Sequence, residues 1–120
     1  MNLNWIKCKG DVWCPLDTVS LSHSHFDSMD GVYIIWHGGS NPKTVRVGQG
    51  KIRERLEAHR TDRDVQAYAH LGLYVTWASV PEDSRDGVEA YLAQRLEPIV
   101  GKRFPDTAPI PVPIPINLPW

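Results

Sequence analysis

Four side chains along this sequence carry the functional groups that hydrolysis of a phosphodiester bond requires. Tyr33 lies in an apolar run, Arg55 and His59 are four residues apart, and Glu89 follows directly after an apolar position. Residues four apart on a helix project from the same face, so Arg55 and His59 can act on one ligand. Each residue alone has an ordinary structural explanation. Tyr33 can be a core aromatic residue, Arg55 and His59 can belong to a solvated helix face, and Glu89 can be a carboxylate near a helix start. Only their joint order and spacing suggest a site.

The hydrophobic pattern predicts three strands to position these groups. β-branched and aromatic residues favour strands at Val32–Trp36 and Thr44–Val47, and the turn-forming residues between them predict an antiparallel hairpin. Asp30-Gly31 is a turn signal before the first strand, and Gly48-Gln49-Gly50 is expected to break the second. Alternating polarity from Leu73 to Val80 predicts the third strand.

Apolar residues four positions apart predict two main helices, over about residues 51–60 and 84–97. Ser84 can cap the second helix and Pro98 ends it. A shorter helix is expected within Asp62–Gly72, where Asp62 can act as the cap and Gly72 as the stop. The apolar residues expected to supply one common core are Ile34, Val45, Ile52, Leu56, Val88 and Leu92.

The order of these motifs resembles that of the GIY-YIG nuclease domain. Gly31-Val32-Tyr33 is similar to the first motif, Val45-Arg46-Val47-Gly48 to the second, and Arg55 to His59 matches the Arg-x-x-x-His of some members. Glu89 resembles the glutamate of the family's last helix. The resemblance covers residues 31–101 and implies an α+β fold, in which a small three-stranded antiparallel sheet is flanked by helices.

The resemblance implies a metal-dependent endonuclease that hydrolyses DNA, with RNA not excluded as a substrate. Glu89 would hold Mg²⁺ or Mn²⁺, and Arg55 would stabilise charge on the phosphate. Tyr33 or His59 would orient or deprotonate the attacking water. A homodimer or a protein partner would supply specificity. The residues expected to contact the substrate are Arg46, Gly48, Gln49, Lys51 and Asn117.

Two positions depart from the family's pattern. Arg46 takes the place of the second motif's tyrosine, which removes a phenol and adds a cation near Tyr33. A nearby cation favours the phenolate, so this arginine can acidify Tyr33. The family's asparagine, expected shortly after Pro98, is Gly101 here, and Asn117 could fill that role if the tail folds back. A catalytically inactive copy that only binds nucleic acid is therefore an alternative function.

Length and composition suit one small globular domain. The 120 residues suffice for one domain, and 42% hydrophobic with 22% charged residues is ordinary. No apolar run reaches the roughly 18 residues of a membrane helix, and no secretory signal is evident, so a cytoplasmic location without a membrane partner is expected. Seven basic residues against three acidic ones between Lys43 and Arg63 indicate a local phosphate-binding face or a solvated helix face.

The first 30 residues are expected to form an arm that packs its tryptophans on the core. Its two cysteines, Cys8 and Cys14, are expected to be reduced thiols in a cytoplasmic protein. Together with His23 and His25 they could instead bind zinc, although these spacings fit no common zinc finger.

Residues 102–120 form a proline-rich tail that holds six of the ten prolines. Proline at this density excludes a helix and favours extended polyproline geometry. The Ile and Val residues between the prolines are expected to hold the tail on the domain as an ordered strap. A ligand that docks to another protein is the alternative, which would make the chain an interaction protein.

Overall fold

A four-stranded antiparallel sheet lies at the centre of the chain, whose computed structural model describes residues 1–101 and 103–115. Its strands are β1 (Cys14–Pro15), β2 (Asp30–His37), β3 (Lys43–Lys51) and β4 (Leu73–Ser79), in the spatial order β1-β4-β2-β3. The predicted α+β class and antiparallel pairing are confirmed. The predicted strand number of three is wrong, because the two-residue β1 pairs with β4. Two residues are too few to show the alternation from which a strand is predicted.

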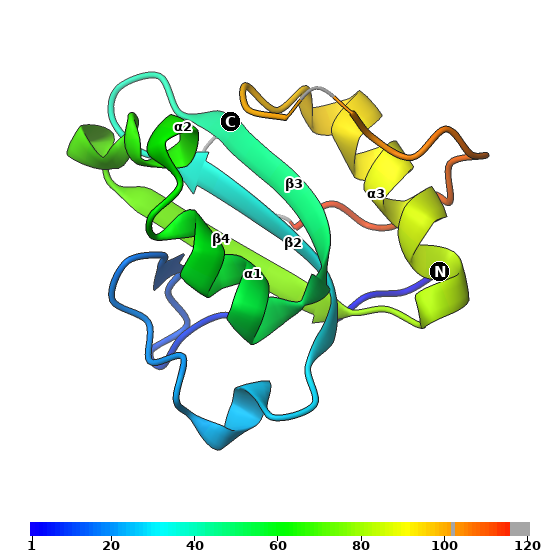
Figure 1. Cartoon of the computed structure of the whole chain (residues 1–120), viewed down its shortest axis with the longest axis horizontal. Coiled ribbons are helices and arrows are strands. Elements are labelled where there is room, and N and C mark those ends of the chain that lie inside the picture. Colours follow the sequence, from blue (N-terminus) through cyan, green and yellow to red (C-terminus); the bar gives the residue numbers. More distant parts are fainter. Residues whose placement is uncertain (102, 116–120) are drawn as a thin grey trace.

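Helices cover both faces of this sheet. The α-helices are α1 (Ile52–His59), α2 (Arg63–Gln66) and α3 (Glu82–Leu96), and two single 3-10 turns are η1 (Ser24–Phe26) and η2 (Ala69–Leu71). In Figure 1 the sheet separates α1 and α2, on one side, from α3 on the other. Among the described residues no helix is both long and apolar enough to cross a membrane.

Two glycine segments lie inside strands where the sequence predicted turns or breaks. Gly48 and Gln49 continue β3 and pair with Tyr33 and Val32, so the predicted strand end is wrong. Gly31 lies within β2, and a Cβ placed on it would be 1.9 Å from the carbonyl oxygen of Ala78. The absence of a side chain therefore lets β2 and β4 approach closely, which a turn-based interpretation of glycine does not anticipate.

The predicted cap of the last helix is also wrong. Helix α3 begins at Glu82, with Pro81 as the preceding residue, and the Ser84 backbone N–H donates to the Pro81 carbonyl. By contrast, the side chain of Asp62 caps α2 by accepting from a backbone N–H, as predicted. Gly72, with a φ of 84°, ends η2, whereas the helix that Asp62 caps already ends at Gln66, so the single short helix predicted up to Gly72 is two separate elements.

The predicted core residues are buried, but they belong to two clusters instead of one. A central sheet with helices on both faces must bury both faces, so a single core cannot form. Tyr33 and Ile35 of β2 point toward α1, whereas Ile34 points toward α3. The α1-side cluster holds Val45, Ile52 and Leu56, and the α3-side cluster holds Ile34, Val88 and Leu92.

The N-terminal residues are linked by a disulfide between Cys8 and Cys14. The prediction of two reduced thiols is therefore wrong, and the alternative zinc site loses both of its thiolates. Its two histidines have other contacts, since the His23 ring accepts from the His25 backbone N–H and the His25 ring accepts from Trp77 Nε1.

Residues 103–115 of the tail run beside α3. The Ile110 N–H donates to the carbonyl of Gly87, Val112 is buried, and the Trp5 indole N–H donates to the carbonyl of Pro113. A Cβ on Gly87 would lie 2.5 Å from the Ile110 side chain, so this helical glycine makes room for the tail. Residues 116–120, which include Asn117, lie outside the described part of the chain.

Candidate active site

Three side chains form a chain of hydrogen bonds on the α1 side of the sheet. Tyr33 Oη on β2 lies 2.6 Å from Nε2 of His59, the last residue of α1. Nδ1 of His59 lies 3.3 Å from Oδ2 of Asp62. Because an ionised carboxylate only accepts, Nδ1 carries the imidazole proton and Nε2 accepts from the phenol. Asp62 was predicted only as a helix cap, and its position three residues after His59 was the signal for this second role.

Gly48 makes room for the phenol. Tyr33 and Gly48 are directly paired across β2 and β3, so their side-chain positions lie on the same face of the sheet. A Cβ on Gly48 would lie 2.2 Å from Tyr33 Oη and 2.5 Å from Cζ, a distance that no side chain could tolerate. Glycine at this position therefore lets the tyrosine ring lie across β3.

Gly50 packs against the predicted catalytic arginine. Its φ of 131° is unfavourable for other residues, whereas a Cβ there would lie at an ordinary contact distance of 3.4 Å from Cγ and Cδ of Arg55. The charge of Arg55 lowers the pKa values of both Tyr33 and His59.

Regular strand pairing places Arg46 on the same face. Tyr33 pairs with Gly48 and Ile35 with Arg46, two residues further along both strands, and the register shifts only beyond this point, where Val45 is the extra residue. Residues two apart on a strand point to the same face of the sheet. Arg46 therefore shares the face of Tyr33, and its charge and hydrogen bonding lower the pKa of the phenol.

Burial sets the charge states of the hydrogen-bonded pair. Desolvation is the largest influence on both groups: it raises the pKa of Tyr33 and lowers the pKa of His59. Arg46 and Arg55 oppose the first shift, and the hydrogen bond to Asp62 opposes the second. At neutral pH the imidazole is therefore neutral and the phenol protonated, which is the state in which Tyr33 can donate to His59.

Glu89 reaches this site from the α3 side. The residue is 8% exposed, and burial raises the pKa of its carboxyl, while a hydrogen bond from Gln49 and the charge of Arg46 oppose that shift. Gln49 Nε2 also donates to Asp86 Oδ1 at 2.7 Å, which ties the end of β3 to α3. The carboxylate of Glu89 in turn raises the pKa of Tyr33. Residues from both helices therefore interact across β3.

The single carboxylate of Glu89 fits one class of metal ion. Mg²⁺ is commonly held by one or two carboxylates, with water and substrate phosphate completing its coordination. A buried carboxylate with a raised pKa is stabilised by a cation, and Gln49 beside it can orient the ligating oxygen. Within residues 1–101 and 103–115 no group of three or more His, Cys, Asp or Glu side chains gathers to form a site made of protein ligands alone.

Two predicted substrate contacts are not placed at this site. Lys51 is exposed, precedes α1, and lines a different cavity together with Asp27 and Arg53. Asn117 falls outside the described residues.

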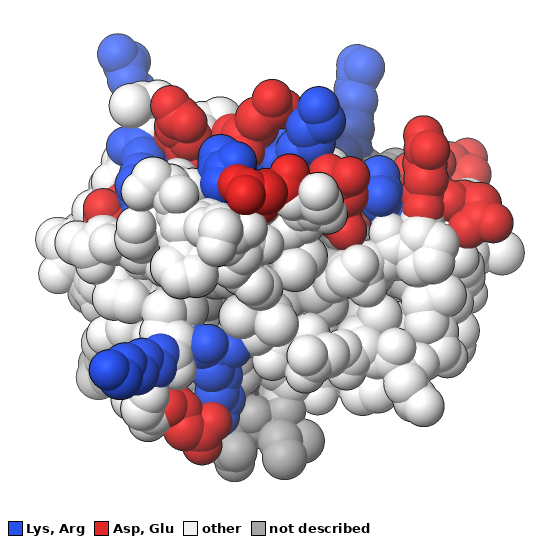
Figure 2. All heavy atoms as spheres, turned by 90° about the horizontal axis from the view of Figure 1, so that it is seen from below, with Lys and Arg blue, Asp and Glu red and all other residues white. Residues whose placement is uncertain are grey.

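The predicted basic face is less positive than its sequence indicates. Arg53 forms an ion pair with Asp27 at 2.8 Å, and the Arg60 guanidinium donates to the backbone carbonyls of Leu16 and Val19. These two arginines hold the N-terminal segment against α1. Figure 2 shows Lys and Arg side chains interspersed with Asp and Glu along one rim of the molecule, above a broad area with few charges.

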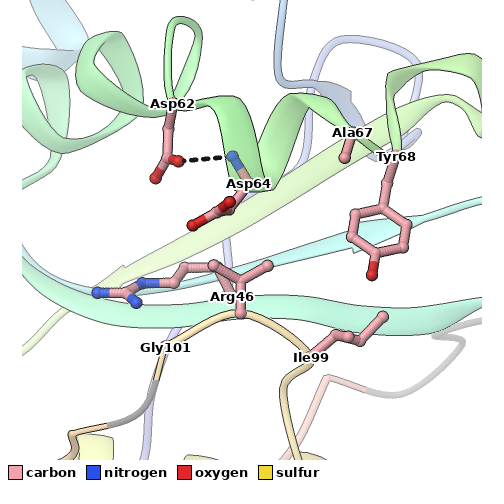
Figure 3. A pocket seen from close by; sticks show the side chains of 8 residues that line it. Arg46, Asp62, Asp64, Ala67, Tyr68, Ile99 and Gly101 are labelled. Atoms are coloured by element: carbon pink, nitrogen blue, oxygen red, sulfur yellow. Dashed lines mark hydrogen bonds between the residues drawn. The ribbon is translucent and has the colours of Figure 1, made fainter.

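A cavity of about 530 Å³ lies beside the hydrogen-bonded chain (Figure 3). Arg46 and Asp62, which contact Tyr33 and His59, also line this cavity. The tyrosine itself is only 1% exposed and is not part of the lining. The remaining lining residues are Asp64, Ala67, Tyr68, Ile99, Val100 and Gly101.

Comparison of the chain with protein-family models, with curated proteins and with solved structures found no match. Its function therefore has to be argued from the chemistry of the site.

Proposed function

We propose that the protein is a metal-dependent endonuclease of the GIY-YIG type that hydrolyses phosphodiester bonds in DNA. The observation that carries this proposal is the chain Tyr33–His59–Asp62, with a 2.6 Å hydrogen bond between phenol and imidazole. Arg46, Arg55 and Glu89 all lie within electrostatic reach of the phenol. The pKa of the phenol thus responds to two cations and one carboxylate, beside its hydrogen bond to the imidazole.

The hydrogen bonds define a path for the proton of an attacking water. The Tyr33 hydroxyl proton passes to Nε2 of His59 while Oη accepts a proton from the water. The water oxygen then attacks phosphorus, the bond to the leaving nucleoside oxygen breaks, and that oxygen takes up a proton from solvent. Asp62 holds the imidazole in the required tautomer and stabilises the imidazolium that forms, through its contact with Nδ1.

The charged residues act on the phosphate. Negative charge builds on its non-bridging oxygens during attack, and the guanidinium of Arg55 can donate to them from α1. Glu89 would hold Mg²⁺ or Mn²⁺, and the bound ion supplies charge neutralisation at the phosphate and the leaving oxygen. Gln49 would keep the Glu89 carboxylate oriented.

A second candidate function is a module of the same fold that binds nucleic acid without cutting it. The burial of the phenol favours it, because Tyr33 is 1% exposed and a substrate could reach it only if the residues around it move. A third, a protein that docks through its proline-rich tail, finds less support. In the described part of the tail, Val112 is buried and Ile110 is hydrogen-bonded to α3, so neither is free to bind a partner.

The substrate, the partner and the cellular location stay predictions. DNA in preference to RNA, and a homodimer or protein partner that supplies specificity, follow only from the resemblance. The cytoplasmic location is likewise a prediction, and the disulfide between Cys8 and Cys14 weighs against it, because disulfides persist mainly in oxidising compartments.

The test is cleavage of supercoiled plasmid DNA in Mg²⁺ or Mn²⁺ by the wild-type chain, Tyr33→Phe and His59→Ala. Tyr91→Phe and His70→Ala are matched controls, because neither residue belongs to the hydrogen-bonded chain. We expect nicking by the wild type and both controls, and a loss of about two to four decades in the two site variants, the usual contribution of a general base.

Intact plasmid in both metals would overturn the nuclease proposal. Salt-sensitive binding of the same DNA by that inactive protein would then support the non-cutting module.

A further inference from the structure

The Arg46 guanidinium lies at the cavity without an anionic partner. Its Nε is buried and has no hydrogen-bond partner, and Arg46 takes part in no ion pair among the described residues. The hydrogen bond of Arg46 to the Tyr33 phenol leaves this Nε unsatisfied, and an unsatisfied buried donor is unfavourable unless a ligand accepts from it. The planar fork of donors of this arginine matches the oxygen atoms of phosphate.

The space for this guanidinium exists because residue 101 has no side chain. A Cβ on Gly101 would lie 2.4 Å from Nη1 of Arg46, and the φ of 103° at Gly101 is itself unfavourable for other residues. The segment cannot simply move away, since the N–H groups of Ile99 and Val100 donate to the carbonyls of Thr44 and Val45 on β3. Gly101 is therefore fixed against Arg46 by backbone hydrogen bonds.

We propose that Arg46 and Gly101 form one phosphate-binding site, in which the guanidinium binds non-bridging oxygens of a phosphate group and the glycine provides the room that it needs. The inference rests on the proposed function for the identity of the substrate, a phosphodiester. Binding itself does not require that the bond be cut. Regular pairing of β2 with β3 places Arg46 on the face of Tyr33, so a phosphate bound here lies beside the phenol.

Two carboxylates line the same cavity and limit its affinity for anions. Asp62 is engaged with His59 and with the N–H of Asp64. The Asp64 carboxylate is exposed and lies on the wall facing Arg46 (Figure 3). It makes no ion pair with Arg46 in the described structure, so it opposes a phosphate without occupying its place. Asp64→Asn is expected to strengthen phosphate binding about twofold to tenfold.

The binding site can be tested with inorganic phosphate as the probe and without metal. The Nε–Hε signal of Arg46 is followed by ¹⁵N NMR during the titration. We expect this signal to shift and saturate. The corresponding signal of Arg53, which already donates from Nε to the Leu21 carbonyl, should not move. Arg46→Lys keeps the charge but loses the fork, and should weaken binding about tenfold.

The role of Gly101 has a matched control in Gly10. Both glycines have positive φ values, 103° and 85°, but a Cβ on Gly10 would meet nothing within 4 Å. Gly10→Ala therefore reproduces the backbone strain without the contact. We expect Gly101→Ala to weaken phosphate binding about tenfold or more relative to Gly10→Ala. In an Arg46→Ala background the two glycine variants should bind phosphate equally weakly.

The outcomes separate this inference from the nuclease proposal. Phosphate that leaves the Arg46 signal unmoved, or Gly101→Ala that binds phosphate as well as Gly10→Ala, would overturn the site. If Gly101→Ala does not fold, undiminished binding by Arg46→Lys would overturn it instead. Phosphate binding at Arg46 without plasmid cleavage would support the phosphate site and refute the nuclease proposal. Cleavage without phosphate binding at Arg46 would support the nuclease proposal and refute the phosphate site.

Discussion

Both faces of the sheet bury an apolar cluster, but the two faces have different roles. Toward α3, the central strand presents Val32, Ile34 and Trp36 to a cluster that is almost wholly apolar. Toward α1, the same strand presents Ile35 to an apolar cluster and Tyr33 to a histidine. One residue of alternation along β2 therefore separates a face that is apolar from a face that carries Tyr33.

The α1 face differs from the α3 face at β3, where a glycine takes the place of a larger side chain. Gly48 has no side chain where the Tyr33 ring needs room, and Gly101, after α3, has none where Arg46 lies. Aliphatic residues at these positions would add apolar contact and remove the site. The comparison indicates that the α1 side of β3 is shaped to hold polar groups, and that α3 contributes Glu89 only at the margin.

The largest effect is expected from Glu89, the one candidate catalytic residue on α3. Glu89→Gln should abolish cleavage in Mg²⁺ and Mn²⁺, because a neutral amide of the same shape does not hold the ion through an anionic oxygen. Thermal unfolding should change little, since burial already disfavours the charged carboxyl. Asp86→Asn, one turn earlier on the same helix, is the control and should still cut. Cleavage at the wild-type rate by Glu89→Gln would remove α3 from the site.

Substitution of two arginines on α1 should have different effects, one on the cleavage rate and the other on thermal stability. Arg55→Ala should lower the cleavage rate by about two to three decades, as expected for one donor to a developing oxyanion. Arg53→Ala should mainly lower thermal stability, because Arg53 binds Asp27 and the Leu21 carbonyl. The measurement is single-turnover cleavage alongside thermal unfolding. Equal rate losses in both variants would mean that α1 acts only as a scaffold.

Matched core deletions should distinguish the two faces directly. Leu56→Ala and Leu92→Ala remove equally buried leucines, and each should cost about 2–5 kcal/mol of unfolding free energy. Leu56→Ala should lower the cleavage rate of the folded fraction more than Leu92→Ala, because α1 carries two residues of the site, Arg55 and His59, and α3 carries one, Glu89. Denaturant unfolding and cleavage at a temperature where both variants are folded provide the test. A larger rate loss in Leu92→Ala would reverse the assignment of the faces.

Truncation after Asp106 should affect the α3 side alone. It removes the buried Val112 and the Ile110 contact with Gly87, and should lower stability by about 2–3 kcal/mol, the contribution of one or two buried aliphatic side chains. Cleavage by the folded truncated chain should be unchanged if Asn117 has no role, and reduced if it has one.

Arg46→Tyr in the full chain should weaken DNA binding if Arg46 is a phosphate contact, whereas a sharp rise in cleavage would mean that the arginine has replaced a more active tyrosine.

Periodicity predicted the larger elements but not the features that shape the site. β2, β4 and the two long helices follow from apolar patterns that any packed sheet requires. The extent of β3 did not, because Gly48 and Gly50 signal turns in a sequence, and the clash with Tyr33 that Gly48 avoids is visible only in three dimensions. The bulge at Val45 and the link from His59 to Asp62 are likewise tertiary features. The disulfide was not predicted, because the prediction of reduced thiols rested on the expected cellular compartment and not on the geometry that brings the two cysteines together.

The smallest expected effect is electrostatic, and it differs in sign between the two faces. On the α1 side, burial lowers the pKa of His59 below 6.5, and the groups that face its ring are Tyr33, Asp62, Arg46 and Arg55. On the α3 side, burial raises the pKa of Glu89 above 4.5. The folded state thus disfavours the charged form of each residue.

Opposite slopes of stability against pH should follow. Below pH 6.5 the unfolded chain takes up a proton at His59 before the folded chain does, so this residue makes stability rise with pH up to 6.5 and adds no slope above it. Above pH 4.5 the unfolded chain loses the Glu89 proton first, so that residue makes stability fall as pH rises, until the folded carboxyl also ionises. Denaturant unfolding of the wild type, His59→Gln and Glu89→Gln across this range measures both. The difference between wild type and His59→Gln should increase with pH, and the difference from Glu89→Gln should decrease. Parallel slopes would mean that the two faces do not bury these groups as described.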